Sequence, residues 1–362
     1  MPRILVTGGG GLIGSEVCEQ FHARGWDVFS IDNDQRGRLF GSAGSVRWNL
    51  ERLARELSRF TNLSFDVRDI AIVHKIFSEY QFDAVVHCAA QPAHEGNVLE
   101  DFSINVKGTL NVLGAWKEVC PDAPFVHLST IKVYGCAPNE ITGYCAPNEI
   151  TGYYRKEHRC RYDFPESHRY CMGFDESLPI DMNGATSFFS RSKLAGELYA
   201  QEYAYRWNLP LAVFRPSCVT GGHHAGTEAH GMLAYMMKCA FLQEPYTVYG
   251  YNGFQVRDQL HVSDLAIAVE KFIETPHRPV VYNIGGGRER ACSVLEAIDL
   301  CEQVTGNKMR IEYGPERIGD HKWWITDAWL FRRTYSWEPQ VSLDEILQDI
   351  YVCGRKRWVA RS

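Results

Sequence analysis

The stretch RILVTGGGGLIGSEV, residues 3–17, decides the fold. Its apolar run over 3–8 leads directly into a glycine-rich turn and then into a helical pattern. Gly8, Gly11 and Gly14 stand in G-x-x-G-x-x-G spacing. Glycines in this context permit a tight turn and let a pyrophosphate approach the helix N-terminus, whose positive dipole end favours anions. The stretch therefore predicts the first strand, turn and helix of a dinucleotide-binding fold.

Further short apolar runs continue this pattern along the first half of the chain. They are apolar nearly throughout, as expected for strands that helices cover on both faces. The predicted strands are 3–8, 27–32, 63–67, 84–90 and 125–130, and the predicted crossover helices are 69–80 and the stretch 97–120. Strands joined in this way form right-handed parallel crossovers. We expect an α/β fold with a doubly wound, Rossmann-type parallel sheet and a smaller α/β substrate-binding lobe.

The length of the chain, 362 residues, exceeds what one hydrophobic core usually supports. We expect a dinucleotide-binding Rossmann domain over 1–195, with a long loop insertion over 135–180. Residues 196–362 should form mainly the substrate-binding lobe, with some segments returning to the Rossmann sheet. In this half the predicted strands are 210–216 and 280–286, and the predicted helices are 264–274, 293–305 and 342–352.

The composition excludes several classes of partner. The chain has 38 Lys plus Arg against 44 Asp plus Glu, a formal charge of −6, and no basic block of the kind that binds nucleic acid or anionic lipid. No apolar run approaches the roughly 18 residues of a membrane span, and the glycine-rich N-terminus differs from a signal peptide. The twelve cysteines are scattered, which favours reduced thiols. We therefore expect a cytoplasmic protein with neither nucleic acid nor membrane as a partner.

The insertion over 135–180 carries a repeated nonapeptide and a group of His and Cys residues. CAPNEITGY occurs at 136–144 and again at 145–153. Because two such copies are too short for a solenoid repeat, we interpret them as a local duplication in a surface loop, which would reshape the mouth of a nearby site. The side chains that could hold zinc are His158, Cys160, His168 and Cys171. Their spacing lacks the usual C-x(2–4)-C pair, so we expect a solvated loop and no metal.

Polar residues stand where three of the predicted strands end. Asp32 follows the glycine turn by about twenty residues, where a carboxylate accepts hydrogen bonds from both ribose hydroxyls and repels a 2′-phosphate. This favours NAD over NADP, although Arg36 nearby keeps NADP open as an alternative. Asp66 follows the third strand, and HCAAQPAH, residues 87–94, begins within the fourth. Both lie at the carboxyl edge, where an open sheet binds ligands.

Ordered motifs along essentially the whole chain carry a family resemblance. They are TGGGGLIG, DND, FDVRD, HCAAQPA, NVKGTLNVL, LSTIKVYG, SRSKLAGE, FRPS and QVRDQLHVSDL. With these motifs the chain resembles the extended short-chain dehydrogenase/reductase family of NAD-dependent nucleotide-sugar epimerases and dehydratases. Within that family, STIKVYG followed by APNE, GFDES and PERIGD is most similar to the CDP-paratose 2-epimerases, also called CDP-tyvelose epimerases.

The resemblance implies a cofactor, a substrate and a partner chain. Such enzymes hold NAD, oxidise a sugar carbon to a ketone and return the hydride to its other face. The implied NAD contacts are Gly8, Gly11, Leu12, Ile13, Gly14, Asp32, Asn33, Asp66, Val67, Ala89, Ala90, Gln91, Asn105, Ser129, Lys193 and Pro216. The implied contacts of a CDP- or UDP-linked sugar are Thr130, Ser217, Arg257, Arg317 and Asp320. A homodimer that pairs the helices near 97–120 and 187–206 is also implied.

The stretch TSFFSRSK, residues 186–193, departs from the family pattern. By resemblance, Thr130 hydrogen-bonds the sugar hydroxyl, Lys193 binds the nicotinamide ribose, and a tyrosine four residues before Lys193 acts as general base. This spacing places the phenol and the amine on one helical face. Phe189 occupies the tyrosine position. A phenyl ring can neither accept nor return a proton, so about 10²–10⁴-fold of acid/base catalysis should be lost.

Several interpretations of Phe189 are open. The chain is an epimerase with another base, a non-catalytic protein that binds NAD and a nucleotide sugar, or an engineered Tyr-to-Phe variant that traps its substrate. Ile131 stands where similar sequences carry Asn, and this second departure favours natural divergence. The candidate replacement bases are Tyr134, Tyr144, Tyr153 and Tyr154. Dehydratases of the family place an acidic pair after the threonine, where this chain has Ile131 and Lys132, and this counts against dehydration.

Overall fold

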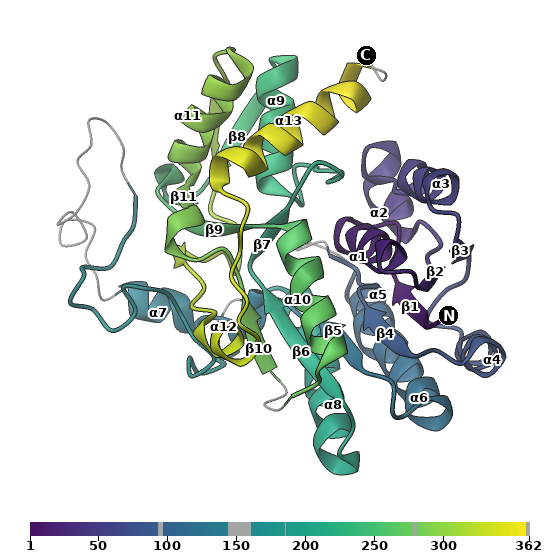
Figure 1. Ribbon diagram of the computed structural model, residues 1–362. Coiled ribbons are helices and arrows are strands. Elements are labelled where there is room, and N and C mark those ends of the chain that lie inside the picture. Colours follow the sequence, from purple (N-terminus) through teal and green to yellow (C-terminus); the bar gives the residue numbers. More distant parts are fainter. Residues whose placement is uncertain (93–96, 144–160, 185, 278–280, 360–362) are drawn as a thin grey trace.

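The computed structural model describes residues 1–92, 97–143, 161–184, 186–277 and 281–359, and within them the core is a seven-stranded parallel sheet (Figure 1). Its strands are β1 (Arg3–Thr7), β2 (Asp27–Ile31), β3 (Phe60–Leu63), β4 (Ala84–His87), β5 (Phe125–Leu128), β6 (Leu211–Pro216) and β10 (Val281–Ile284). They lie in the order β10-β6-β5-β4-β1-β2-β3, so the chain reverses direction across the sheet between β1 and β4. Such a reversal is the switch point of a doubly wound sheet. The predicted fold class is confirmed.

Helices cover both faces of the sheet because its strands carry apolar side chains on both. In β1, Ile4 and Val6 belong to one buried cluster and Leu5 to another, since successive side chains of a strand point to opposite faces. The first cluster is covered by α1 (Leu12–Ala23) and α10 (Val262–Glu274). The second is covered by α4 (Ile70–Tyr80), α6 (Thr109–Val119) and α8 (Phe188–Trp207).

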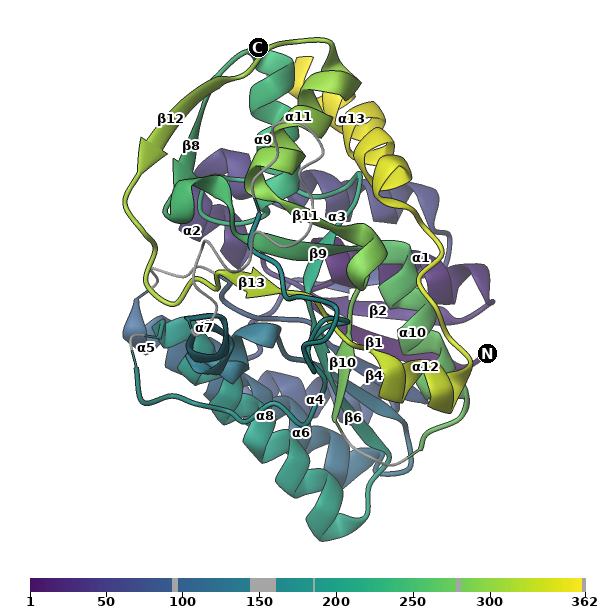
Figure 2. The same cartoon turned by 90° about the vertical axis from the view of Figure 1, so that its left-hand side faces the viewer.

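A second lobe lies at the top of Figures 1 and 2. In the described chain it holds a four-stranded sheet, in which β7 (Cys218–Thr220), β11 (Ala291–Ser293) and β13 (Trp323–Trp324) all pair with β9 (Val256–His261). β8 (Pro245–Tyr249) pairs with β12 (Arg310–Gly314). The helices α9 (Met232–Leu242), α11 (Val294–Thr305) and α13 (Leu343–Val359) share an apolar cluster of their own. The lobe therefore has a hydrophobic core separate from those of the large sheet.

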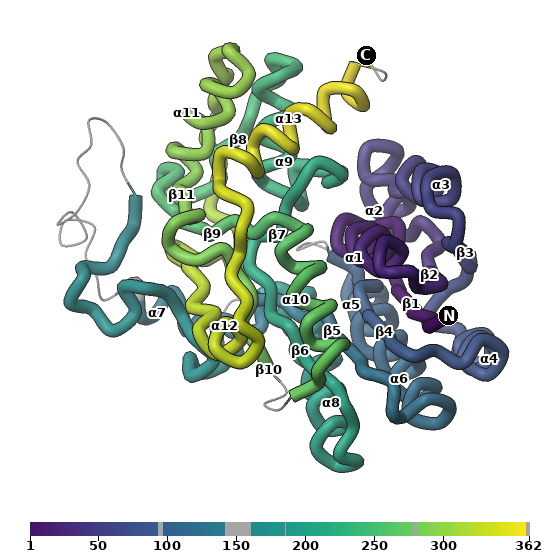
Figure 3. Tube along the Cα trace, viewed as in Figure 1, coloured from purple at the N-terminus to yellow at the C-terminus, as the bar shows by residue number. Residues whose placement is uncertain are grey.

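Short helices fill the connections, as the tube in Figure 3 traces. They are α2 (Gln35–Gly44), α3 (Arg47–Glu56), α5 (Val98–Phe102), the π-helix η1 (Ser103–Gly108), η2 (Ile131–Tyr134), α7 (Ala137–Gly143), η4 (Tyr251–Gly253), η5 (Arg288–Arg290) and α12 (Trp329–Tyr335). The predicted helices 69–80, 97–120, 264–274 and 293–305 are confirmed, and the one over 342–352 continues to Val359. No helix in the described ranges is long and apolar enough to cross a membrane.

The predicted strand over 63–67 is wrong in its bounds, because the observed strand β3 ends at Leu63. β3 lies at the edge of the sheet and pairs with β2 alone, as far as Ile31 opposite Leu63. Because β2 ends at Ile31, the apolar residues that follow Leu63 have no neighbouring strand to pair with. Asp66 instead stabilises a turn, in which its carboxylate accepts the Arg68 backbone N–H at 2.9 Å.

The predicted loop over 135–180 is wrong in its first part, where α7 forms inside the first CAPNEITGY copy. The Asn139 side chain donates to the Asp320 carbonyl at 2.7 Å and accepts the Lys322 N–H at 2.7 Å. These two bonds hold α7 against the segment that precedes β13. Several predicted features lie outside the described residues, namely the second copy at 145–153 and Tyr144, Tyr153, Tyr154, His158 and Cys160.

The other described part of the insertion, residues 161–180, is only partly solvated, because Phe164, Tyr170, Phe174 and Leu178 are buried in an apolar cluster while Met172 and Ile180 are exposed. Phe164 belongs to an apolar cluster with Trp323, and their ring centroids lie 4.7 Å apart. His168, a predicted zinc candidate, stacks on Phe164 at a centroid distance of 4.2 Å. The Cys171 carbonyl accepts a hydrogen bond from Arg288. Within the part of the chain that the structure describes, no three His, Cys, Asp or Glu side chains are grouped to hold a metal.

A buried polar network joins α8 to the large sheet. Glu197 of α8 pairs with Arg215 of β6 at 2.5 Å, and their side chains are 0% and 6% exposed. Glu197 also accepts the Ser129 hydroxyl, and Arg215 donates to the Tyr134 hydroxyl at 2.9 Å. Tyr134 in turn donates to the Asn283 side chain of β10 at 2.8 Å. The network therefore fixes α8, η2 and the carboxyl ends of β5 and β6 relative to one another.

Arg215→Met should lower the free energy of unfolding by about 3–5 kcal/mol, because it leaves the Glu197 carboxylate buried and unpaired. Tyr134→Phe keeps the ion pair and should cost only about 1–2 kcal/mol. Urea denaturation followed by circular dichroism measures both. Arg206→Met, which breaks an exposed pair with Glu202 on the same helix, is the control and should cost at most about 0.5 kcal/mol. Equal losses in all three variants would show that the network is not critical.

Candidate functional site

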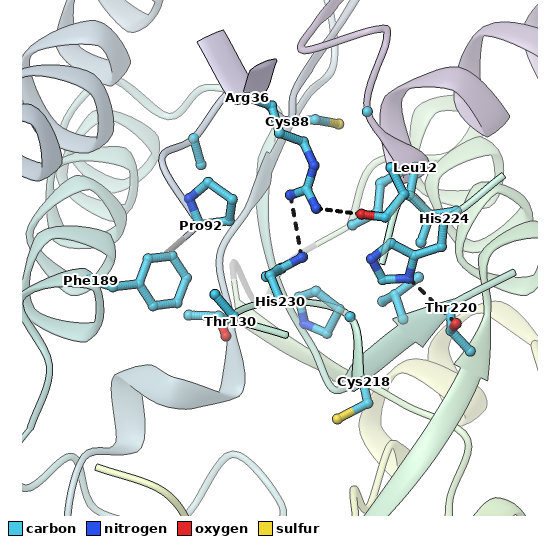
Figure 4. Close-up of a pocket in the computed structure, with 18 of the residues that line it drawn as sticks. Leu12, Arg36, Cys88, Pro92, Thr130, Phe189, Cys218, Thr220, His224 and His230 are labelled. Atoms are coloured by element: carbon cyan, nitrogen blue, oxygen red, sulfur yellow. Dashed lines mark hydrogen bonds between the residues drawn. The ribbon is translucent and has the colours of Figure 1, made fainter. Parts of the chain in front are cut away.

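A cavity of about 470 Å³ lies at the carboxyl ends of the strands of the large sheet. One wall is formed by residues that follow β1, β2, β4, β5 and β6, and the other by residues of the second lobe. An open α/β sheet binds its ligands at this edge, beside the switch point. The cavity is therefore the candidate site, and Figure 4 shows part of its lining.

The glycine turn leaves space and donors for a phosphate group. Gly8 has φ +74°, and a Cβ there would lie 2.9 Å from the Ala89 nitrogen. A Cβ on Gly14 would lie 2.1 Å from the Gly8 carbonyl oxygen, so α1 packs directly on the turn. In the described structure no side chain caps the N-terminus of α1 at Gly11. Its first-turn N–H groups and the dipole of a twelve-residue helix therefore face the cavity, an arrangement that fits a pyrophosphate.

Acidic side chains lie beside this turn at the ends of β2 and β3. The Asp32 carboxylate accepts the N–H groups of Gly10 and Asp34, each at 2.8 Å. Burial raises the pKa of Asp32 above its usual value, and these two donors oppose that shift. Asn33 donates to the Asp66 carboxylate at 3.1 Å. Because Asp32 lines the cavity next to the glycine turn, its carboxylate fits the ribose hydroxyls of a dinucleotide. Both Asp66 oxygens instead accept hydrogen bonds from Arg68, at 2.9 and 2.7 Å.

Arg36 does not lie free beside Asp32. Its guanidinium points across the cavity, where it donates to the Ala225 carbonyl at 2.8 Å and contacts His230 Nδ1 at 3.3 Å (Figure 4). Both acceptors belong to the segment between β7 and α9. Arg36, the residue that left NADP as an alternative cofactor, is therefore already bonded to another part of the chain.

The three predicted catalytic residues, Thr130, Phe189 and Lys193, all line this cavity. Thr130 follows β5 and caps η2, since its hydroxyl accepts the Lys132 N–H at 3.2 Å. Phe189 projects from α8 into the cavity on the same side as Thr130 (Figure 4). Lys193 lies one turn later on α8, on the same helical face. Helix α8 therefore places the Phe189 ring, which stands where the family has a phenol, in the space beside Thr130.

Lys193 keeps its place without a phenol. Its side chain is 4% exposed, and Nζ donates to the Leu128 carbonyl at 2.6 Å, at the end of β5. Burial lowers the pKa of Lys193 to about 8, an effect that the nearby Glu197 opposes. The amine therefore remains largely charged at neutral pH.

Tyr134, a candidate replacement base, is a packed aromatic residue. It is fully buried, and its hydroxyl is bonded to Arg215 and Asn283. Burial raises its pKa to about 12. Among the described residues it is not part of the cavity lining, so it cannot replace the missing base.

A charged cluster forms the substrate side of the cavity. Arg257 donates to the Asp320 carboxylate at 2.6 Å, and Lys132 Nζ donates to the same carboxylate at 3.1 Å. Although burial alone would raise it, Arg257 and Lys132 hold the pKa of Asp320 well below its usual range. Two cations thus share one carboxylate, which leaves a net positive charge that suits a diphosphate. Ser217 also lines the cavity, and its hydroxyl donates to the Asp258 carbonyl at 3.2 Å.

Arg317, in the segment after β12, also lines the cavity. Its guanidinium lies 3.9 Å from the centre of the Tyr249 ring, and it donates to the Glu228 carbonyl at 3.1 Å. The Tyr249 hydroxyl donates to the Glu228 carboxylate at 2.6 Å. The planar guanidinium and the ring form a polar, aromatic end to the cavity.

Two predicted cofactor residues, Gln91 and Asn105, are not among the described residues that line the cavity. Asn105 is buried, donates to the Gln91 carbonyl and to Ser192 of α8, and accepts the Gln91 N–H. Both residues therefore brace the strand end against α8. The other predicted cofactor residues line the cavity, namely Gly8, Gly11, Leu12, Ile13, Gly14, Asp32, Asn33, Asp66, Val67, Ala89, Ala90, Ser129, Lys193 and Pro216.

Several residues of the cavity wall were not predicted from the sequence as binding or catalytic residues. They include Cys218, Tyr235 and Tyr246, and most of the segment 221–231, GGHHAGTEAHG. This segment is rich in glycine and histidine but has no spacing that indicates a mechanism. Lys132 could have been found, because it follows a strand end and stands next to Thr130.

Comparisons with known proteins agree with this geometry. The model of the NAD dependent epimerase/dehydratase family matches residues 4–160 and 164–285. CDP-paratose 2-epimerase from Salmonella typhi is 29% identical over 370 aligned residues, which cover 96% of this chain and 98% of that protein. dTDP-glucose 4,6-dehydratase from Xanthomonas campestris is 26% identical, with 95% and 91% covered. The structure of UDP-glucose 4-epimerase from Bifidobacterium longum with NAD⁺ and UDP has a TM-score of 0.77, 25% identity and 98% coverage of each chain.

The family match spans well over half of the chain and both lobes. It agrees with the glycine turn, with the acidic residues beside it and with the parallel sheet that carries them. The expectations of an enzyme family and of NAD as its cofactor are therefore confirmed. The chain belongs to the NAD dependent epimerase/dehydratase family.

Proposed function

We propose that this protein is a nucleotide-sugar epimerase of the CDP-paratose 2-epimerase type, built to oxidise and re-reduce a sugar carbon. One observation carries the proposal: Thr130, Phe189 and Lys193 line a single cavity together with the glycine turn and Arg257. NAD supplies hydride acceptance and return when it is bound. The identity with CDP-paratose 2-epimerase supports a CDP-linked sugar, and a UDP-linked sugar is the alternative.

The domain division and compartment belong to the same proposal. Residues 1–195 form the NAD-binding domain, and residues 196–362 contribute mainly the nucleotide-sugar lobe. The return of β6 and β10 from the second part to the large sheet supports this proposal, and because residue 195 lies inside α8 (Phe188–Trp207), the two parts share that helix. The negative formal charge, −6, and the absence of basic blocks support a cytoplasmic enzyme that acts on small molecules.

The chain's own residues have distinct tasks in this reaction. The Thr130 hydroxyl binds the sugar hydroxyl that must lose its proton. Lys193, anchored to the Leu128 carbonyl, binds the nicotinamide ribose and supplies positive charge. Phe189 fills the space of a general base but moves no proton, so turnover should be about 10²–10⁴-fold lower than with tyrosine. A non-catalytic protein that binds NAD and a nucleotide sugar is the alternative, and an engineered trapping variant is a second one.

Dehydration is the less favoured reaction. The position after Thr130 holds Ile131, whose side chain is buried in the apolar cluster with Trp324. Lys132 follows, and its amine is bonded to Asp320 and the Gly319 carbonyl. Elimination of water needs an acid and a base at these positions. Neither residue offers a carboxylate.

Calorimetric titration should show that NAD binds with micromolar affinity or tighter and that NADP binds at least about tenfold more weakly, because its 2′-phosphate meets the Asp32 carboxylate. Gly14→Ala should abolish NAD binding, since its Cβ would lie 2.1 Å from the Gly8 oxygen. Circular dichroism checks that this variant is folded. NADP binding as tight as that of NAD would refute the assignment of Asp32.

Phe189→Tyr should raise turnover of the correct nucleotide sugar by about 10²–10⁴-fold, because it restores the general base beside Thr130 and Lys193. Candidate CDP- and UDP-sugars are incubated with the protein in deuterated buffer, and NMR follows the stereochemistry of the sugar. Phe188→Tyr is the matched control: this neighbouring ring is 54% exposed and should give no gain.

Three outcomes separate the alternatives for Phe189. Epimerised product from the unaltered protein would end the non-catalytic alternative. Lys193→Met in the Phe189→Tyr background should remove the gain, since the amine favours the phenolate. A Phe189→Tyr protein that binds NAD and nucleotide sugars normally but epimerises none of them would overturn the epimerase proposal.

The proposed homodimer rests on an apolar surface shared by α5 and α8. Helix α8 contacts both α5 and α6. The exposed apolar residues of α5 and α8 include Leu99, which is 77% exposed, and Phe102, Leu198 and Tyr199. Exposed apolar residues on two helices in contact are typical of a surface that a protein interface buries.

Light scattering should give twice the mass of one chain at micromolar concentration. Leu99→Glu combined with Leu198→Glu should give a monomer, because two carboxylates would be buried in the interface without partners. Met172→Glu changes an exposed apolar residue elsewhere and should leave the dimer intact. A monomeric mass for the unaltered chain would refute the homodimer.

A further inference from the structure

The segment 221–231, which joins β7 to α9, forms one wall of the cavity and is anchored to its own lobe. The Gly222 N–H donates to the Asp349 carboxylate of α13 at 2.6 Å. The Glu228 carbonyl accepts from Arg317 at 3.1 Å. These contacts hold the segment to the second lobe but do not join it to the sheet.

Arg36 makes the connection across the cavity. It lies in α2, on the wall that also carries Asp32, and donates to the Ala225 carbonyl at 2.8 Å. Its second contact is with His230 Nδ1, 3.3 Å away (Figure 4). Because a guanidinium has donors and no acceptor, His230 Nδ1 must be the acceptor and carries no proton. The fork of Arg36 therefore binds two points on the opposite wall.

Breaking this connection is costly because Arg36 is partly buried. Its guanidinium lies over the Phe40 ring, 4.9 Å from the centroid. Burial lowers the pKa of Arg36 to about 10, so the side chain stays charged at neutral pH. A partly buried cation that loses its hydrogen-bond acceptors keeps part of its desolvation cost without compensation. The two walls are therefore stable together.

A neighbouring contact reinforces the closed arrangement. Trp48 of α3 lies against His223 of the same segment, with ring centroids 6.1 Å apart. Arg357 of α13 lies over the Trp48 ring at 4.6 Å and donates to the Gly222 carbonyl at 2.6 Å. Arg36 and Trp48 thus approach the segment from the sheet side at two places.

We infer that Arg36 is a positioning residue that holds the segment 221–231 against the cofactor wall and thereby slows the release of NAD. The inference rests on the proposed binding of NAD in this cavity. Asp32 lies on one wall and the segment on the other, so opening this end of the cavity requires Arg36 to give up both acceptors. An epimerase that regenerates its cofactor in each turnover gains from a closed site, because NAD need not leave.

Release is measured by loading the protein with NADH, adding excess NAD and following the nicotinamide fluorescence as NADH leaves. Arg36→Met should release NADH about tenfold faster, the effect expected for the loss of one hydrogen-bonded charge. Arg36→Lys keeps the charge but cannot bridge both acceptors, and should give a smaller increase. If Arg36→Met fails to fold, Arg36→Lys still tests the inference.

Arg38→Met is the matched control, because Arg38 lies in the same helix and bonds only weakly, to Gln35 at 3.5 Å. It removes the same charge near an anionic cofactor and should leave the release rate unchanged. Equal rates for the unaltered protein and both Arg36 variants would overturn the inference. A selective loss of NADP affinity in Arg36→Met would also overturn the inference, since Arg36 would then bind the 2′-phosphate of NADP. Failure of the unaltered chain to bind NADH would instead overturn the proposed function itself.

Discussion

The position of the whole site depends on the buried ion pair between Glu197 and Arg215. Glu197 lies one helical turn after Lys193 and two turns after Phe189, so fixing it fixes the face of α8 that meets the cavity. A buried pair of this kind is stable only where further hydrogen bonds satisfy both ions, and Ser129 and Tyr134 provide them. The ends of β5 and β6 and the face of α8 that meets the cavity are therefore one structural unit, which leaves little freedom to reposition one of these cavity side chains alone.

Against this rigid background Phe189 is a local change. The Phe189 ring lines the cavity, Lys193 is bonded to the Leu128 carbonyl, and Thr130 lies at the end of β5. Under the proposed function, a phenyl ring at this position would separate two properties, the ability to hold a cofactor and a sugar in register and the ability to move a proton between them.

Local signals in the sequence predicted the large sheet, most of the helices and the glycine turn, because these depend on residues close together in the chain. The bounds of the edge strand β3 were predicted wrongly, because the end of β2 determines where β3 ends and the apolar pattern of β3 itself does not. The role of Arg36 could not be predicted, since its partners Ala225 and His230 are almost 200 residues away, with separations of 189 and 194. Burial of Tyr134 in a polar network, and of Gln91 and Asn105 behind the cavity wall, likewise depends on contacts between distant segments.

The anchoring of α7 through Asn139 has a consequence for the duplicated nonapeptide. The bonds to the Asp320 carbonyl and the Lys322 N–H use a residue that lies four positions after Gly135. Removing either copy of CAPNEITGY leaves the same polypeptide, because the copies are identical and adjacent. The asparagine at this position is therefore kept whichever copy is lost. Loss of one nine-residue unit would therefore leave unchanged the residue that docks α7.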